Sequence, residues 1–256
     1  MKKIFGNIIN FLKIFLMFAM LFITITVISS VCFSMSTKLF NQFSGFDPDN
    51  CFLLLTIHHI LQAIITTIII VFISIALKIP LKDFGFNTKN FRYSIKMVQV
   101  FCFLWIMIQT GGSILLIKMT SMSAALTYPL TFKNFLGYFL FEILFTGTSE
   151  ELLFRSLTIP VMLFSLNTFL KSEQKSQIIA ISASTLIFML AHINFNLNPF
   201  KITYFNLLQQ ITCFIFGTFF GWLFIKSKSV LGPMFAHNLL NGIITIVGFI
   251  MYIIFG

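Results

Sequence analysis

Residues 12–31 of the chain read LKIFLMFAMLFITITVISSV, a run in which Lys13 is the only ionisable side chain. A helix needs about 20 apolar residues to cross the hydrocarbon core of a bilayer, whereas the strands of a membrane barrel are short and alternate in polarity. The run therefore predicts a membrane-spanning helix. No small-residue cleavage site follows it, so we expect it to be retained as the first span.

The composition of the whole chain agrees with this prediction. Of the 256 residues, 58% are apolar and only 9% are charged, and the mean hydropathy is +0.98. A water-soluble fold could not hide so much apolar surface. The predicted fold class is all-α, a polytopic transmembrane helix bundle that forms a single domain over residues 1–256 in the lipid bilayer.

Apolar runs separated by polar or proline-containing joints predict about seven spans, within a range of six to eight. The motif-bearing core described below is expected at about residues 136–256. The expected spans are residues 8–35, 51–77, 95–117, 136–165, 177–198, 203–225 and 233–255.

The basic residues indicate how the helices cross the membrane. The chain has 17 Lys and Arg against 7 Asp and Glu, giving a net charge of +10. These residues flank apolar segments, so they are interpreted as topology signals and predict no nucleic-acid partner. With the N-terminus inside, eleven of them fall on the cytoplasmic side: Lys2, Lys3, Lys78, Lys82, Lys89, Arg92, Lys96, Lys171, Lys175, Lys226 and Lys228. Four fall outside: Lys38, Lys118, Lys133 and Lys201.

The four cysteines are scattered through or beside apolar segments and have no metal-ligand spacing. We interpret Cys32, Cys51, Cys102 and Cys213 as packing residues.

Ionisable residues inside the fourth predicted span need a reason to be there, because each costs about 2.5–3.5 kcal/mol at the bilayer centre. Glu151 and Arg155 are four residues apart and can pair on one helix face. Glu150 is turned about 100 degrees from Glu151, so one arginine cannot neutralise both acids. Glu150 is therefore the candidate general base. The alternative is a structural salt bridge beside a carboxyl that faces a watery crevice.

Two further spans carry groups that chemistry uses. Phe188 and His192 are four residues apart near the end of the fifth span, and His237 and Asn241 are four apart on the seventh. Three helices that each supply such groups, in a chain with little other intramembrane polarity, predict one shared site.

Three other ionisable residues in the spans are left out of this site. His58 and His59 are adjacent, so they point in different directions, and we expect them to pack in the core or in a crevice. Glu142 is expected near the outer membrane surface.

The three motifs, in this order along the chain, resemble those of the CAAX protease and bacteriocin-processing family of membrane peptidases, also called the Abi family. The resemblance covers about residues 142–242. The motif positions are Glu-Glu-x-x-x-Arg at Glu150, Glu151 and Arg155, Phe-x-x-x-His at Phe188 and His192, and His-x-x-x-Asn at His237 and Asn241.

The resemblance implies peptide-bond hydrolysis, with Glu150 and His192 activating a water molecule. His237 and Asn241 would lie near the oxygen that becomes negative, and Arg155 would hold Glu151 in place. No cofactor is expected. The alternative is a zinc ion on Glu150, His192 and His237, because two histidines and one carboxylate can hold zinc with a water position open.

The predicted substrate is a peptide or a membrane protein, of the lipidated, pheromone or bacteriocin type. One alternative is a non-catalytic bacteriocin self-immunity or membrane partner protein of the same fold. The other is a proton-coupled carrier, which the absence of an internal repeat disfavours. We expect a multi-pass protein of a bacterial cell membrane with a cytoplasmic N-terminus. The site is expected to open to the cytoplasm, because His237 lies near the start of the last span. The sequence predicts no oligomeric state.

Overall fold

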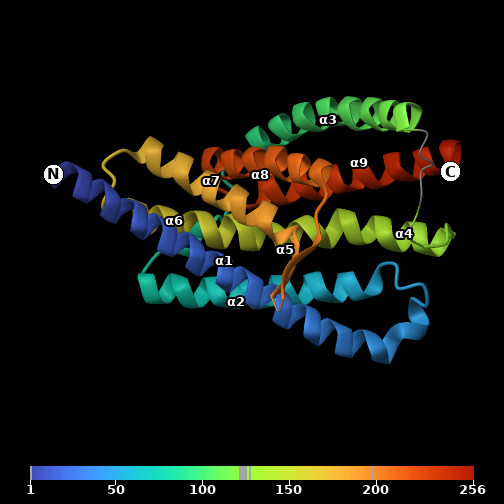
Figure 1. Ribbon diagram of the computed structural model, residues 1–256, viewed down its shortest axis with the longest axis horizontal. Helices are drawn as coiled ribbons and strands as arrows, with labels where there is room; N and C mark the ends of the chain where they lie inside the picture. The colour runs from blue at the N-terminus through green and yellow to red at the C-terminus, as the bar shows by residue number, and fades with distance from the viewer. Residues whose placement is uncertain (1, 121–125, 127, 198) are drawn as a thin grey trace.

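The chain folds into a bundle of long helices, which Figure 1 shows lying roughly along one direction. The computed structural model describes all residues except 1, 121–125, 127 and 198. Six of the described helices are long and apolar enough to cross a membrane. They are α1 (Lys2–Phe43), α2 (Leu53–Leu77), α3 (Phe91–Thr120), α7 (Glu173–Ala191), α8 (Leu207–Ser227) and α9 (Leu231–Phe255). The predicted all-α polytopic bundle is thereby confirmed.

Residues 132–166 form one further continuous rod that contains two π-helical turns. Its parts are α4 (Phe132–Phe141), a π-turn (Glu142–Thr146), α5 (Gly147–Glu151), a second π-turn (Leu152–Leu157) and α6 (Thr158–Leu166). The residues at the junctions keep right-handed helical dihedrals, so the rod does not break. At 1.5 Å per residue it is about 50 Å long, which is sufficient for the predicted fourth span. We call this element the central rod.

The segment between the fifth and sixth predicted spans differs from the expectation. We expected helix to residue 198 and again from 203, but α7 ends at Ala191 and α8 begins at Leu207. An antiparallel hairpin of β1 (Asn194–Leu197) and β2 (Phe200–Tyr204) connects them. Asn194 and Asn196 explain the early end of α7, because asparagine is a poor helix former and the predicted span had continued through both residues.

Side-chain hydrogen bonds join the central rod to its neighbours. The Ser184 hydroxyl of α7 donates to the Phe154 carbonyl at 2.6 Å, and the Ser156 hydroxyl donates to the Phe84 carbonyl at 2.5 Å. Both hydroxyls are buried, so each donor needs such a partner at this depth. These contacts place the second half of α7 beside the middle of the central rod.

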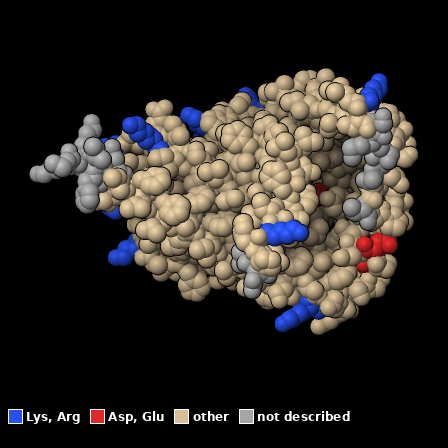
Figure 2. Space-filling model, in the orientation of Figure 1, with Lys and Arg blue, Asp and Glu red and all other residues tan. Residues whose placement is uncertain are grey.

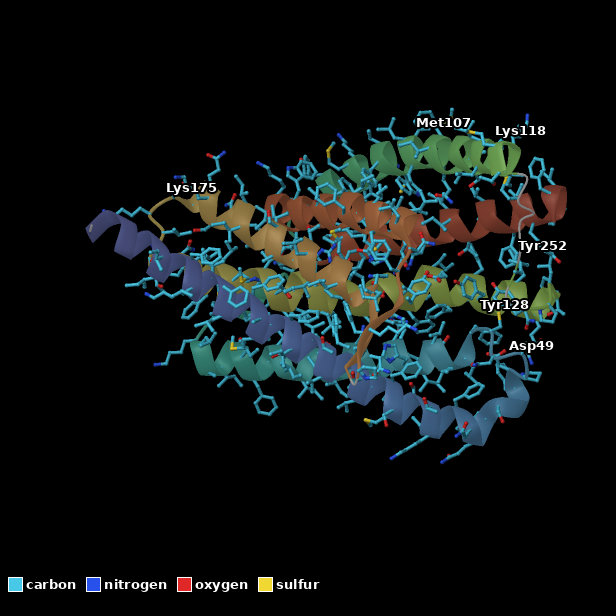
Figure 3. All side chains as sticks on the ribbon, in the orientation of Figure 1. Asp49, Met107, Lys118, Tyr128, Lys175 and Tyr252 are labelled. Carbon is cyan, nitrogen blue, oxygen red and sulfur yellow. The ribbon has the colours of Figure 1, made fainter. Side chains whose placement is uncertain are left out.

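The two ends of the bundle differ in their residues. Lys175 lies at the end where the chain begins, whereas Asp49 and Tyr128 lie at the opposite end (Figure 3). The second end is built around Asp47, whose carboxylate accepts hydrogen bonds from the backbone N–H groups of Cys51, Phe52 and Leu53 at 2.7–3.0 Å. These bonds cap the start of α2. We call the Lys175 end the basic end and the Asp47 end the capped end.

Gly147 allows the central rod to approach α9 closely. A Cβ atom at this position would lie 2.6 Å from the Oδ1 atom of Asn238 and 2.6 Å from the Cβ atom of His237. Nothing lies within 4 Å of the corresponding position at Gly248 on α9. Of these two glycines, Gly147 is therefore required by helix packing and Gly248 is not.

Gly147→Ala should lower the free energy of unfolding by about 1–3 kcal/mol, because the added methyl overpacks the contact between the rod and α9. Gly248→Ala is the matched control, and it should raise stability by up to about 1 kcal/mol through helix propensity. Unfolding in detergent micelles measures both variants. Equal stability of the two would show that the rod and α9 are not in the predicted close contact.

Candidate active site

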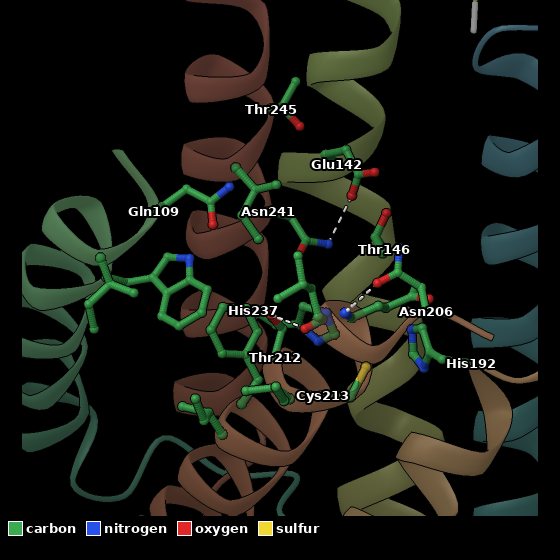
Figure 4. A pocket seen from close by; sticks show the side chains of 18 of the residues that line it. Gln109, Glu142, Thr146, His192, Asn206, Thr212, Cys213, His237, Asn241 and Thr245 are labelled. Atoms are coloured by element: carbon green, nitrogen blue, oxygen red, sulfur yellow. Dashed lines mark hydrogen bonds between the residues drawn. The ribbon is translucent and has the colours of Figure 1, made fainter. Parts of the chain in front are cut away.

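A cavity of about 590 Å³ opens between α3, the central rod, α7, α8 and α9. Four of the six predicted site residues line it, namely Glu150, His192, His237 and Asn241. Figure 4 shows His192 and His237 facing the same space from different helices. The structure therefore brings together the three sequence motifs.

Glu151 and Arg155 lie behind this cavity and form the predicted ion pair. The Nε atom of Arg155 is 3.2 Å from the Oε2 atom of Glu151, and both side chains are fully buried. Arg155 Nη2 also donates to the carbonyl of Gly217 on α8 at 3.5 Å. The pair is thus part of the interior of the bundle and contacts the cavity only through other residues.

Three aromatic rings surround the Arg155 guanidinium. Its Cζ atom lies 4.9 Å from the ring centre of Phe188, 5.4 Å from that of Phe220 and 5.9 Å from that of Phe154. A cation over an aromatic face is attracted by the ring quadrupole, more strongly where water is excluded. The phenylalanine of the Phe-x-x-x-His motif thereby has a physical role, because Phe188 also contacts His192 and His237.

His237 connects the buried ion pair to the cavity. Its Nδ1 atom is 2.9 Å from the Oε1 atom of Glu151, and its Nε2 atom is 3.8 Å from the Oε2 atom of Glu150. A carboxylate only accepts hydrogen bonds, so Nδ1 carries a proton and donates it to Glu151. In the neutral ring Nε2 then presents a lone pair toward Glu150 and the cavity.

Glu150 is the acid with the fewest partners in this arrangement. Its side chain is 15% exposed, whereas that of Glu151 is fully buried. The Oε2 atom of Glu150 is buried and has no hydrogen-bond partner among the described residues. The sequence prediction that Arg155 would pair with Glu151 and leave Glu150 free agrees with this geometry.

His192 caps the C-terminus of α7 and enters the cavity from the side opposite His237 (Figure 4). Its Nδ1 atom is 2.8 Å from the carbonyl of Phe188, four residues earlier. A carbonyl only accepts, so Nδ1–H is the donor and the neutral ring keeps a lone pair on Nε2. That nitrogen is the one available to hold a water molecule.

Glu142 belongs to the cavity, although it was left out of the predicted site. It lines the cavity, and its Oε2 atom accepts a hydrogen bond from Asn241 Nδ2 at 2.8 Å (Figure 4). A spacing signal could have found it, because residues 142, 146 and 150 follow one helical stripe. Both Thr146 and Glu150 line the same cavity.

His58 and His59 lie outside the cavity, as expected. Both are buried, and His59 Nδ1 is 2.5 Å from the Ser149 hydroxyl of the central rod. Gln62 donates to the same hydroxyl at 3.3 Å. These contacts tie α2 to the residue that precedes Glu150.

The zinc alternative was tested against the arrangement of the side chains. In the part of the chain that the structure describes, no three His, Cys, Asp or Glu side chains are grouped so that they could hold a metal ion. The set of Glu150, His192 and His237 is therefore not assembled as a metal site.

The cavity extends from the level of Glu150 toward the capped end of the bundle. Its lining includes Tyr138 and Glu142 from the first half of the central rod, Leu116 near the end of α3 and Thr245 in the second half of α9. Figure 2 shows its mouth as a hollow with acidic atoms at the bottom. We expected access from the cytoplasmic side, which the charge pattern assigns to the basic end, whereas the lining of the cavity extends toward the capped end. The position of His237 near the start of α9 is misleading, because its ring faces the middle of the bundle.

Comparison with known proteins shows that the motif-bearing segment of the chain is similar to one family. No curated protein and no solved structure matches the chain. The family model described as type II CAAX prenyl endopeptidase Rce1-like matches residues 132–243. This segment begins with the central rod and ends within α9, so it includes all six predicted site residues. Over residues 132–243 the chain is therefore similar to the type II CAAX prenyl endopeptidase Rce1-like family.

Proposed function

We propose that the chain is an intramembrane endopeptidase in which Glu150 activates a water molecule. The observation that supports this most directly is the position of Glu150. It faces the cavity without a bonded counter-charge, whereas the adjacent Glu151 is held by Arg155 and His237. A carboxylate in that environment is free to accept a proton.

The side chains around Glu150 can divide the hydrolysis between them. The oxygen of the water attacks the peptide carbonyl carbon, and Glu150 takes a proton from the water as it does so. Nε2 of His192 accepts a hydrogen bond from the second O–H of that water and so orients it; this hydrogen stays on the attacking oxygen. Glu150 then returns the proton to the leaving amine.

Asn241 stabilises the negative oxygen that forms during the attack. One of its amide hydrogens is held by Glu142, and this bond fixes the amide plane. The second hydrogen can then donate to the oxyanion. One such donor contributes about 3–4 kcal/mol to the transition state in other hydrolases.

The substrate class that suits the cavity is a peptide or membrane protein with an apolar or lipidated stretch near the cleaved bond. Trp105 and Ile108 of α3 and Ile211 and Ile215 of α8 form apolar walls beside the polar groups. Lys175 and the N-terminus lie at the basic end, whereas Lys118 lies at the capped end (Figure 3). Under the positive-inside rule, the N-terminus lies in the cytoplasm and the cavity opens from the extracytoplasmic half.

Glu150→Gln should reduce peptide cleavage to background while the folded yield stays unchanged, because it removes the base and keeps the shape of the side chain. Purified protein is incubated with a labelled peptide library that includes lipidated and apolar sequences. The matched control is Glu173→Gln, an exposed glutamate at the start of α7. Normal turnover by the Glu150 variant would refute the mechanism, and no cleavage by the unmodified chain would refute the function.

Arg155→Met should lower the free energy of unfolding by about 3–5 kcal/mol, because Glu151 keeps a buried charge without a counter-charge. The double variant Arg155→Met with Glu151→Gln should regain most of that loss, because no buried charge remains. It should stay poorly active, since a neutral amide holds His237 less firmly. Detergent unfolding and peptide cleavage are measured together. Equal stability of the single and double variants would show that the pair is not coupled.

A cysteine placed in the cavity tests the proposed access side. Gln109→Cys lies in the cavity wall and should react with a membrane-impermeant maleimide applied to intact cells. Lys89→Cys, at the basic end, should react only in inside-out vesicles. The natural cysteines are all buried, so the unmodified chain provides the blank. The reverse labelling pattern would invert the orientation, and labelling of both from one side would contradict the position of the cavity.

A further inference from the structure

The β1–β2 hairpin lies directly beside the candidate site. It follows His192 and ends just before Asn206, and both of these residues line the cavity. The rings of Phe188 and Phe154 are 5.0 Å apart, which places the end of α7 beside the middle of the central rod. The hairpin therefore leaves the bundle near mid-length, as Figure 1 shows, and not at either end.

An open strand at this depth is physically unusual. Within the described residues the sheet has only two strands, and all five residues of β2 are exposed. Unpaired backbone N–H and C=O groups are costly in hydrocarbon, so an open edge at membrane depth needs a partner or a watery cavity. The edge is continuous with the cavity, because Phe205 alone separates β2 from Asn206.

A peptidase needs such an edge for a chemical reason. In a helix, the carbonyl of the bond to be cleaved is hydrogen-bonded and screened by side chains, so water reaches it poorly. An extended peptide exposes that carbonyl. Addition of a strand to a free sheet edge is a common way to hold a peptide extended, because the backbone supplies the affinity whatever the sequence.

We propose that the free edge of β2 binds the substrate as an added β-strand. The peptide bond that is to be cleaved then lies beside His192 and Glu150. This inference rests on the peptidase function proposed above. Phe200 and Ile202 alternate along β2 and therefore share one face of the strand. A register shift in the hairpin ends this alternation before Tyr204. The paired substrate accordingly presents apolar side chains at every second position on that face.

The register of the hairpin identifies which backbone groups are available. Leu197 pairs with Phe200, with two residues between them, and Asn196 pairs with Lys201. Across so short a connection the flanking pair is the hydrogen-bonded one, and hydrogen-bonded and open pairs alternate along an antiparallel ladder. The N–H and C=O groups of Lys201 therefore point to the free edge of β2.

The substrate side is tested with the peptide that the unmodified chain cleaves fastest in the library assay. Each backbone amide near the cleaved bond is replaced in turn by its N-methyl form, which removes one donor. Strand pairing predicts that kcat/KM falls about tenfold at every second position and little between them, since one lost hydrogen bond has about that effect. Losses without a period of two overturn the proposal.

The chain itself is tested with Lys201→Pro, which removes the outward N–H, against Lys201→Ala, which removes the same side chain and keeps the N–H. Cleavage of the same peptide should have a KM about tenfold higher in Lys201→Pro than in Lys201→Ala, with similar kcat and equal thermal unfolding. Equal KM values overturn the proposal while leaving the peptidase function in place. If the unmodified chain cleaves no peptide, the peptidase function fails and the strand proposal fails with it.

Discussion

The fully buried guanidinium of Arg155 sets the constraint on which the site depends. A lone cation inside a membrane bundle would be very costly, so Glu151 must lie within reach of it, and three aromatic rings complete its surroundings. With one carboxylate oxygen directed at Arg155, the other oxygen of Glu151 is available to His237. The proton on Nδ1 of His237 and the orientation of its ring, with Nε2 toward Glu150, follow from this charge pair. Arg155 thus fixes the positions of Glu151 and His237 without lining the cavity.

The shape of the cavity comes from the lengths of the helices. The central rod and α9 extend toward the capped end, whereas α7 stops at Ala191, beside the middle of the rod. The space beyond the end of α7 stays open, and the first turns of α8 form part of its wall. The hairpin connects the two helices at this level. One early helix end therefore produces the cavity, the position of His192 and the open strand edge together.

The sequence predicted much of the site because its signals are local. The spacing of Glu151 and Arg155 places both on one face of a helix in any fold that contains that helix. The contribution of Glu142 to the cavity was not predicted from the sequence. Its spacing from Glu150 was visible, yet its partner Asn241 is on another helix and 99 residues away. The hairpin was missed for a different reason, because the predicted fifth span was continued through Asn194 and Asn196 to residue 198, although asparagine is a poor helix former.

The sequence by itself determined the membrane class, the approximate spans and the pairing of Glu151 with Arg155, because hydropathy and helical periodicity act over short distances. The family motifs also predicted six candidate site residues, four of which line the cavity. Only the tertiary structure decided that His237 lies between two carboxylates, that Glu142 holds Asn241 and that the cavity opens toward the capped end. Those features depend on how far each helix extends and which face it turns to its neighbours. They follow from packing between distant segments, which a linear pattern does not encode.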